Sequence, residues 1–121
     1  MNLFQLGNFV SHAGNELEWK IECDALTDDD WECLAKMISE KTNFGSVYGI
    51  PRGGTKLANA LEKYKNPKNP IRLVVDDVWT TGKSMRDVMQ KNDIGFVVFA
   101  RERIQFSPDF YVRALFTMEV L

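Results

Sequence analysis

The pattern most able to support chemistry is a pair of adjacent carboxylates, Asp76 and Asp77, between an apolar run and a small polar loop. The run at 73–75 is typical of a strand buried on both faces of a parallel sheet, so the acids are expected where that strand ends. A helix is expected to begin at Ser84, because Ser84 and Asp87 have the spacing of a capping box. The polar loop before this helix contains Thr80, Thr81, Gly82 and Lys83.

This order of strand, acids, loop and helix suits a sugar phosphate. Backbone N–H groups of such a loop can hold a phosphate dianion, and the carboxylates can accept hydrogen bonds from the sugar hydroxyls beside it. A nucleoside triphosphate loop is excluded, because the G-x-x-x-x-G-K-[ST] pattern needs a glycine five positions before Gly82, where Asp77 stands. The simpler alternative is a strand-to-helix turn whose acids only cap the helix.

A second candidate loop follows the short apolar strand expected at 45–50. Two glycines, Gly53 and Gly54, let the backbone approach an anion closely, and the Arg52 guanidinium adds charge-assisted hydrogen bonds. Alone, Arg-Gly-Gly is more often a plain turn. Together with the Asp76–Asp77 loop it indicates two anion sites in one crevice, which fits a doubly phosphorylated ligand.

The remaining elements alternate in type. A strand at 16–23 has one wet face, and Thr27 with Asp30 caps an amphipathic helix that ends near Lys41. A helix over 57–64, a short helix over 85–89 and strands at 94–100 and 111–121 follow, whereas residues 1–10 show no decisive period. Strands that alternate with helices predict a parallel α/β sheet, whose ligands bind at the carboxyl ends of its strands. The strand at 94–100 brings Arg101 to that edge.

Composition limits the classes of function. The chain has 121 residues and a net charge of −2, which predicts one domain and gives nucleic-acid binding no electrostatic support. No apolar run is long enough to cross a bilayer, so we expect no membrane association. Two cysteines and one histidine have neither the number nor the spacing of a zinc site or a disulfide framework. We therefore expect a protein of the reducing cytoplasm.

The stretch Val75-Asp-Asp-Val-Trp-Thr-Thr-Gly-Lys-Ser84 resembles the phosphoribosyl-pyrophosphate (PRPP) signature of type I phosphoribosyltransferases, and most of the chain resembles orotate phosphoribosyltransferases. Residues 49–54 look like the pyrophosphate loop of those enzymes. The turn at 11–14 and the strand after it look like their base-covering segment. Residues 99–103 are similar to the strand end that presents an arginine to the base.

The resemblance implies an α/β fold with a single parallel sheet flanked by helices. Residues 1–121 form one domain, in which 1–24 are a reduced N-terminal hood over the base and 25–121 are the core. It implies transfer of the phosphoribosyl group of PRPP to a nucleobase with release of pyrophosphate, by a pentosyltransferase of nucleotide metabolism such as pyrimidine biosynthesis or salvage. It further implies magnesium, held indirectly by Asp76 and Asp77 through ribose hydroxyls and water, and a homodimer. The resemblance also implies a role for each group of residues. The ribose hydroxyls and the oxocarbenium-like transition state would be held by Asp76 and Asp77, and the 5-phosphate by Thr80, Thr81, Gly82, Lys83 and Ser84. The pyrophosphate would be bound by Arg52, Gly53 and Gly54, and the base would be contacted by Arg101, His12 and Thr80.

Two departures from the family pattern stand out. His12 stands where the family has a lysine that faces the base, and its simpler reading is a solvated turn. The connection between Leu61 and Leu73 is too short for the mobile loop whose lysine and histidine cover the pyrophosphate in the family, although Lys65 and Lys68 lie in the right part of the chain.

Three hypotheses follow from the sequence: a compact phosphoribosyltransferase with slow turnover, a regulatory module that binds PRPP or a nucleotide without turnover, and an unrelated α/β domain with a chance motif. The first two predict a bent pyrophosphate loop with a cis peptide bond around Pro51-Arg52 or Arg52-Gly53.

Overall fold

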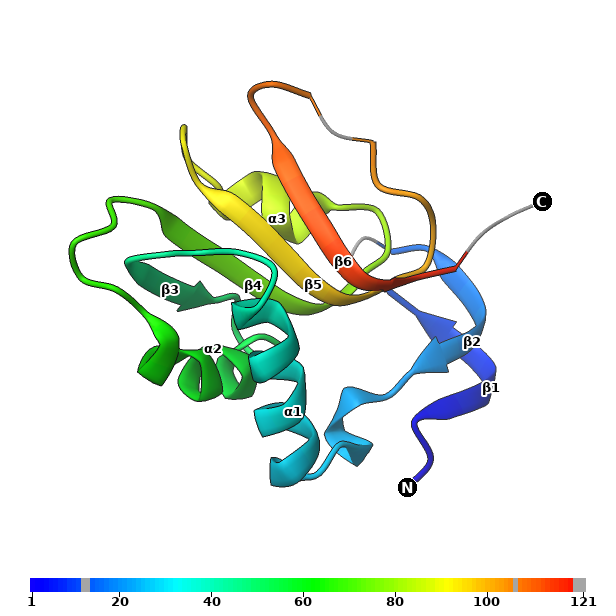
Figure 1. Ribbon diagram of the computed structural model, residues 1–121. Coiled ribbons are helices and arrows are strands. Elements are labelled where there is room, and N and C mark those ends of the chain that lie inside the picture. The colour runs from blue at the N-terminus through cyan, green and yellow to red at the C-terminus, as the bar shows by residue number, and fades with distance from the viewer. Residues whose placement is uncertain (12–13, 106, 119–121) are drawn as a thin grey trace.

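The computed structural model describes residues 1–11, 14–105 and 107–118 of the chain. These residues form two sheets, three α-helices and two short 3-10 helices (Figure 1). In chain order the elements are β1 (Phe4–Val10), β2 (Glu16–Ile21), η1 (Cys23–Ala25), α1 (Asp28–Ser39), β3 (Ser46–Gly49), α2 (Thr55–Leu61), η2 (Glu62–Tyr64), β4 (Arg72–Trp79), α3 (Lys83–Val88), β5 (Ile94–Ala100) and β6 (Tyr111–Thr117).

The main sheet has four parallel strands in the order β3-β4-β5-β6, which confirms the predicted fold class. Its two central strands are the apolar runs of the sequence. Leu73, Val74 and Val75 of β4 are fully buried, and β5 has the predicted bounds. Both faces of these strands are covered by helices, so consecutive residues can all be apolar.

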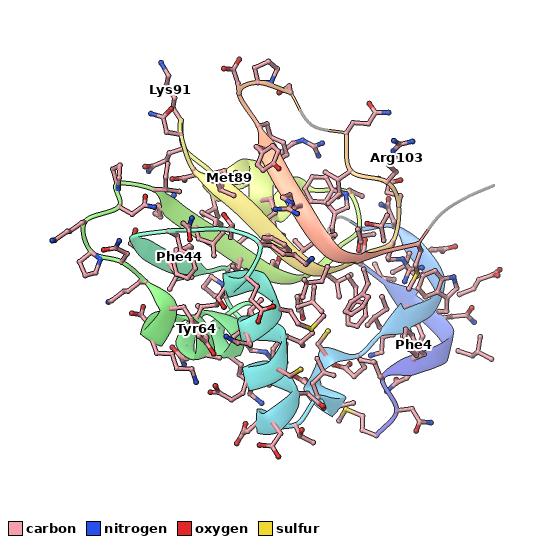
Figure 2. The ribbon with its side chains drawn as sticks, viewed as in Figure 1. Phe4, Phe44, Tyr64, Met89, Lys91 and Arg103 are labelled. Atoms are coloured by element: carbon pink, nitrogen blue, oxygen red, sulfur yellow. The ribbon has the colours of Figure 1, made fainter. Side chains whose placement is uncertain are left out.

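Helices cover the two faces of this sheet unequally. Helices α1 and α2 lie together on one face, where Phe44 and Phe96 belong to the larger core cluster (Figures 1 and 2). Helix α3 lies on the other face with Met85 in the smaller cluster. The capping box at the start of α1 is confirmed: Thr27 Oγ1 accepts from the Asp30 N–H at 3.1 Å, and Asp30 Oδ2 accepts from the Thr27 N–H at 2.9 Å.

The N-terminal segment forms an antiparallel pair, β1 and β2, here called the N-terminal hairpin. Strand β2 was predicted, but β1 was not, because most of its residues are exposed and Gly7, at φ 157°, stands next to a break in the register between Leu6 and Phe9. The hairpin lies beside the carboxyl ends of the main strands (Figure 1). Phe4 of β1 meets the ring of Phe99 at 6.3 Å between centroids, which ties the hairpin to the main sheet.

Two local predictions were wrong. Strand β4 continues through both acids to Trp79, because Asp76 and Val78 keep their pairing with β5, opposite Val97 and Phe99. Helix α3 begins at Lys83 and not at Ser84. Gly82, at φ 83°, is its N-cap, and no side chain caps the helix. None of the described helices is long and apolar enough to cross a membrane.

Candidate functional site

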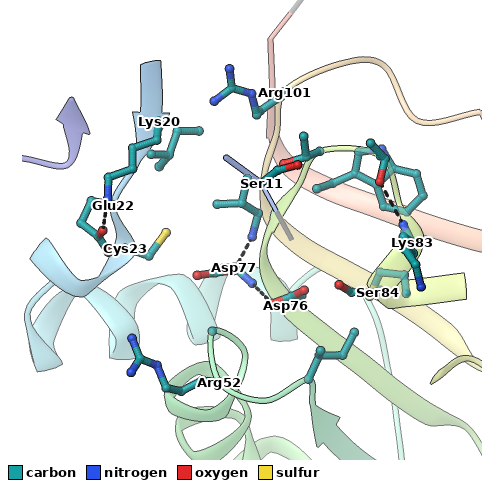
Figure 3. A pocket seen from close by; sticks show the side chains of 18 of the residues that line it. Ser11, Lys20, Glu22, Cys23, Arg52, Asp76, Asp77, Lys83, Ser84 and Arg101 are labelled. Carbon is teal, nitrogen blue, oxygen red and sulfur yellow. Dashed lines mark hydrogen bonds and ion pairs between the residues drawn. The ribbon is translucent and has the colours of Figure 1, made fainter. Parts of the chain in front are cut away.

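A cleft of about 850 Å³ opens at the carboxyl ends of the main strands, with the N-terminal hairpin as its opposite wall (Figure 3). It gathers residues from segments that are far apart in the sequence. Of the predicted site residues, Gly54 is buried and is not among the residues that line the cleft, and His12 lies outside the described residues. The others line the cleft: Arg52, Gly53, Asp76, Asp77, Thr80, Thr81, Gly82, Lys83, Ser84 and Arg101.

Asp76 lies at the floor of the cleft and is the one charged residue that is buried as a whole among the described residues, at 8% exposure. Its Oδ1 accepts a hydrogen bond of 2.8 Å from the Asp77 N–H. Nowhere in the described chain does a cation pair with it. Burial, together with the negative charge of Asp77, raises the pKa of Asp76 to about 8. A buried acid without a cation is unfavourable for stability, and such groups concentrate at functional sites.

The titration of Asp76 gives the first prediction. An unfolded carboxyl group titrates near pH 4, so between about pH 4 and pH 8 the folded state keeps a proton that the unfolded state releases. The free energy of unfolding of the ligand-free protein should therefore fall as the pH rises through this window. Asparagine at position 76 has no such proton to lose. We therefore expect the free energy of unfolding of Asp76→Asn to exceed that of the wild type by at least roughly 2 kcal/mol at pH 8 and to be similar to it at pH 4.

Denaturant unfolding of both proteins at several pH values between 4 and 8.5 measures this difference. Asp109→Asn, at an exposed position, is the control and should follow the wild type. Parallel stability curves for the wild type and Asp76→Asn would contradict the prediction.

Asp77 connects the two motifs. Its Oδ1 accepts from the Val78 N–H at 2.7 Å, and both carboxylate oxygens would lie 2.5 Å from a β-carbon placed on Gly53. A side chain at position 53 of the loop at 51–54 would therefore have to push the Asp77 carboxylate aside. A β-carbon on Gly54 would lie 2.3 Å from the carbonyl oxygen of Val75, so Gly54 sets how closely the loop approaches β4.

The loop at 51–54, here called the arginine loop, has the predicted bend. The peptide bond between Pro51 and Arg52 is cis. Arg52 is almost fully exposed at the mouth of the cleft, and its Nη2 lies 3.6 Å from Asp24 Oδ2. The guanidinium is thus held only loosely before a ligand arrives.

Residues 80–84, here called the phosphate loop, form the far end of the cleft. The Thr81 Oγ1 accepts from the Lys83 N–H at 3.4 Å, and the Arg86 guanidinium donates to the Thr81 carbonyl oxygen at 2.6 Å. The Lys83 amine pairs with Asp87 of its own helix at 2.6 Å. Thr80 and Ser84 also line the cleft. An anion here would meet hydroxyls and backbone amides, and the Lys83 amine would have to leave Asp87 to reach it.

Arg101 lies across the cleft from Arg52 (Figure 3). Its Nη1 donates to the Trp19 carbonyl oxygen at 2.8 Å, and its guanidinium carbon lies 3.3 Å from the centre of a Trp19 ring. Burial lowers the pKa of Arg101. Arg101 therefore joins the end of β5 to the N-terminal hairpin and fixes the hairpin over this end of the cleft.

The hairpin contributes cleft residues that sequence reasoning missed. Lys20 and Glu22, which form an ion pair of 2.9 Å, belong to the expected wet face of the strand at 16–23. Both line a wall of the cleft, together with Leu17, Ile21 and Cys23 of the strand's apolar face. Cys23 is a buried free thiol in the same wall, and burial followed by the charge of Asp77 raises its pKa. Lys56, in the first turn of α2, also lines the cleft. The strict alternation of 16–23 was the available signal, but it cannot show which element covers the polar face.

Lys65 and Lys68 are not among the cleft residues. They belong to the connection that precedes Arg72, the first residue of β4. The cleft lies at the carboxyl end of β4, so this connection is at the opposite edge of the sheet. Neither lysine can cover the cleft of its own chain.

Neither protein-family models nor curated proteins match the sequence, but solved structures match the fold. Orotate phosphoribosyltransferase from Aeropyrum pernix superposes with a TM-score of 0.72 at 17% identity, over 95% of this chain and 88% of that chain. UMP synthase from Leishmania donovani gives 0.73 at 13% identity, over 96% of this chain and 34% of that chain. Orotate phosphoribosyltransferase from Mycobacterium tuberculosis H37Rv, solved with inorganic phosphate, gives a TM-score of 0.61 at 15% identity, over 93% of this chain and 86% of that chain. The chain thus has the type I phosphoribosyltransferase fold, in the form found in orotate phosphoribosyltransferases.

Proposed function

We propose that this protein is a phosphoribosyltransferase that joins a nucleobase to the ribose of PRPP and releases pyrophosphate, in nucleotide biosynthesis or salvage. The observation that carries the proposal is the direct approach of the arginine loop to Asp77, beside the buried carboxylate of Asp76. A ligand with a sugar between two phosphate groups needs acceptors for its hydroxyls next to a place for an anion. The cleft offers the carboxylates of Asp76 and Asp77 as acceptors, and the arginine loop, as a place for an anion, packs directly against Asp77.

Each part of PRPP then has a place in the cleft. The phosphate loop takes the 5-phosphate through hydroxyls and amides. Asp76 and Asp77 accept hydrogen bonds from the ribose hydroxyls. The arginine loop, including Arg52, takes the pyrophosphate. In the reaction a ring nitrogen of the base forms a bond to ribose C1 while the bond from C1 to the pyrophosphate oxygen breaks, and the proton of that nitrogen passes to solvent.

Charge separation explains why these residue types suit the reaction. Positive charge builds on the sugar as the C1–O bond stretches, and it faces the carboxylates of Asp76 and Asp77. Negative charge builds on the departing pyrophosphate, and it faces Arg52. Preorganised charges of this kind act where charge develops in the transition state and are commonly the largest contribution to catalysis.

Magnesium fits the donor set. In the described ranges no group of three His, Cys, Asp or Glu side chains could hold a metal alone. Two adjacent carboxylates with a phosphate ligand suit Mg²⁺, which keeps several waters and binds through one or two carboxylates and substrate phosphates. Asp76 and Asp77 would hold it through water and ribose hydroxyls. When bound, the metal offsets negative charge on the leaving group.

The N-terminal hairpin, within residues 1–24, would cover the base, with Arg101 and Thr80 at that end and His12 assigned there by sequence alone. Residues 25–121 would supply the rest of the site as the core of a single domain. Two free cysteines are in keeping with a reducing cytoplasm, and we propose a homodimer there, without nucleic-acid or membrane partners.

A second candidate function keeps the ligand and omits the turnover: a regulatory module that binds PRPP or a nucleotide. Within the described chain, Lys65 and Lys68 are far from the cleft, which favours this alternative. Calorimetry with PRPP and Mg²⁺ tests the ligand, and a transfer assay with orotate, uracil and purine bases separates the two candidates. PRPP binding with product formation supports the enzyme, and binding without product supports the module. Absence of PRPP binding would overturn the enzyme and the PRPP-binding module, and calorimetry with nucleoside monophosphates would then test the nucleotide-binding form of the module.

The Gly53–Asp77 contact supports a prediction of its own. A methyl group at position 53 would displace the Asp77 carboxylate, because the two would otherwise lie 2.5 Å apart. We expect Gly53→Ala to raise the Kd of PRPP about tenfold or more by loss of charge-assisted hydrogen bonds, with a change in stability below about 1 kcal/mol, since a side-chain end can move aside. Calorimetry and denaturant unfolding measure the two effects. A variant that binds PRPP like the wild type would show that Asp77 does not hold the sugar.

A further inference from the structure

We infer that Lys56 is a pyrophosphate-binding residue of this cleft, in place of cations that the chain cannot bring from a lid. The inference rests on the proposed function and deepens it. It comes from the interactions of the cationic side chains around the cleft, because most of them already pair with another group of the protein. Within the described chain, Lys56 is a cleft lysine without such a pairing.

Three of these cations are engaged elsewhere. Lys20 forms an ion pair of 2.9 Å with Glu22. The Lys83 amine lies 2.6 Å from Asp87. Arg101 stacks on Trp19 and donates to the carbonyl oxygen of that residue at 2.8 Å. Moving any of them onto a phosphate would break an existing interaction.

Beside the Mg²⁺ proposed above, Arg52 adds only one positive charge, whereas a pyrophosphate group carries several negative charges. Its pairing with Asp24 at 3.6 Å is loose, and both side chains are mostly exposed, so it is free to turn to a ligand. One further cation close to the arginine loop would supply the missing charge.

Lys56 meets this requirement by position. It is the second residue of α2, which begins directly after the arginine loop, and it lines the same cleft as Arg52, Gly53 and Asp77. Its side chain is exposed, and in the described part of the chain no hydrogen bond or ion pair holds its amine. A lysine on a flexible four-carbon stem can follow a charge that moves as the leaving group departs.

The test uses ligands with and without the pyrophosphate. Wild type, Lys56→Met and Lys56→Arg are titrated with PRPP and Mg²⁺, with pyrophosphate and Mg²⁺, and with ribose 5-phosphate. We expect Lys56→Met to raise the Kd of PRPP and of pyrophosphate about tenfold, as for one charge-assisted hydrogen bond, and to leave that of ribose 5-phosphate unchanged. Lys56→Arg should recover most of the affinity.

Lys91→Met is the matched control. Lys91 is also an exposed lysine, but it precedes β5 at the edge of the sheet away from the cleft (Figure 2). Equal affinities of the Lys56→Met and Lys91→Met variants for pyrophosphate would overturn the inference, and so would an equal loss for ribose 5-phosphate. If the wild type binds PRPP and Lys56→Met is unaffected, only the inference fails. If the wild type does not bind PRPP, the proposed function fails with it.

Discussion

Replacing Asp76 and Asp77 together by asparagine is expected to abolish magnesium-dependent PRPP binding while the fold stays intact. Asparagine keeps the size of each side chain, but it removes two negative charges and places an amide donor where an acceptor is needed. Hydrogen bonds to a charged acceptor contribute about 1.5–3 kcal/mol each, so loss of one per side chain raises Kd by more than roughly 100-fold. Calorimetry with PRPP and Mg²⁺ measures the loss.

Structural roles for the same residues make the opposite prediction for stability. If Asp76 were retained only as an acceptor for the Asp77 N–H, the double variant would lose stability, because a partly buried N–H would be left with a poorer partner. If it is retained for a ligand, the variant makes the ligand-free protein more stable at neutral pH, because an asparagine at position 76 does not have to take up a proton on folding. Circular dichroism and denaturant unfolding decide between these. Retained PRPP affinity would remove the basis of the proposed function.

Much of the fold could be predicted because buried strands and helices each leave a characteristic pattern of apolar residues in the sequence. Strand β5 matched its predicted bounds, since all its residues are buried or half-buried between two layers. Helix α1 was recognisable from the spacing of its buried face and the Thr27–Asp30 capping box. Strand β1 has no such signal, because its pattern is mostly exposed and its pairing with β2 shifts after Leu6.

The start of α3 shows why local motifs can mislead. Ser84 and Asp87 have capping-box spacing, yet the N-cap is Gly82, two residues before Ser84, in the left-handed conformation. Asp87 forms an ion pair with Lys83 instead of capping the helix. Backbone conformation at one glycine decided the boundary, and the spacing of polar residues did not.

The candidate site was predictable where it depended on sheet topology. Parallel strands place their carboxyl ends at one edge, so the two loops and Arg101 were expected together. The distance between the loops was not predictable, because it depends on how closely the arginine loop packs against Asp77. Lys20 and Glu22 were missed for a similar reason: their role depends on where the hairpin lies relative to the sheet.

Slow turnover is the second large effect that we expect. The reaction needs cations over the departing pyrophosphate and exclusion of water that would hydrolyse PRPP. The described chain places no lid over the cleft, and the connection with Lys65 and Lys68 lies at the other edge of the sheet. Loss of one preorganised donor from a site of this kind commonly lowers the rate about 100- to 1000-fold. PRPP should therefore bind better than it reacts.

Steady-state rates with orotate and with purine bases, compared with the Kd of PRPP, test this expectation. The Lys65→Ala/Lys68→Ala variant separates two ways in which the site could work, because these lysines can reach a cleft only from a second chain. If a partner supplies them, the wild-type rate per chain rises with protein concentration and the variant loses that rise. If the chain acts alone, both proteins are equally slow at every concentration, since the same carboxylates and the same Arg52 remain. Fast turnover by a monomer, unchanged in the variant, would show that this cleft stabilises the leaving group without a lid.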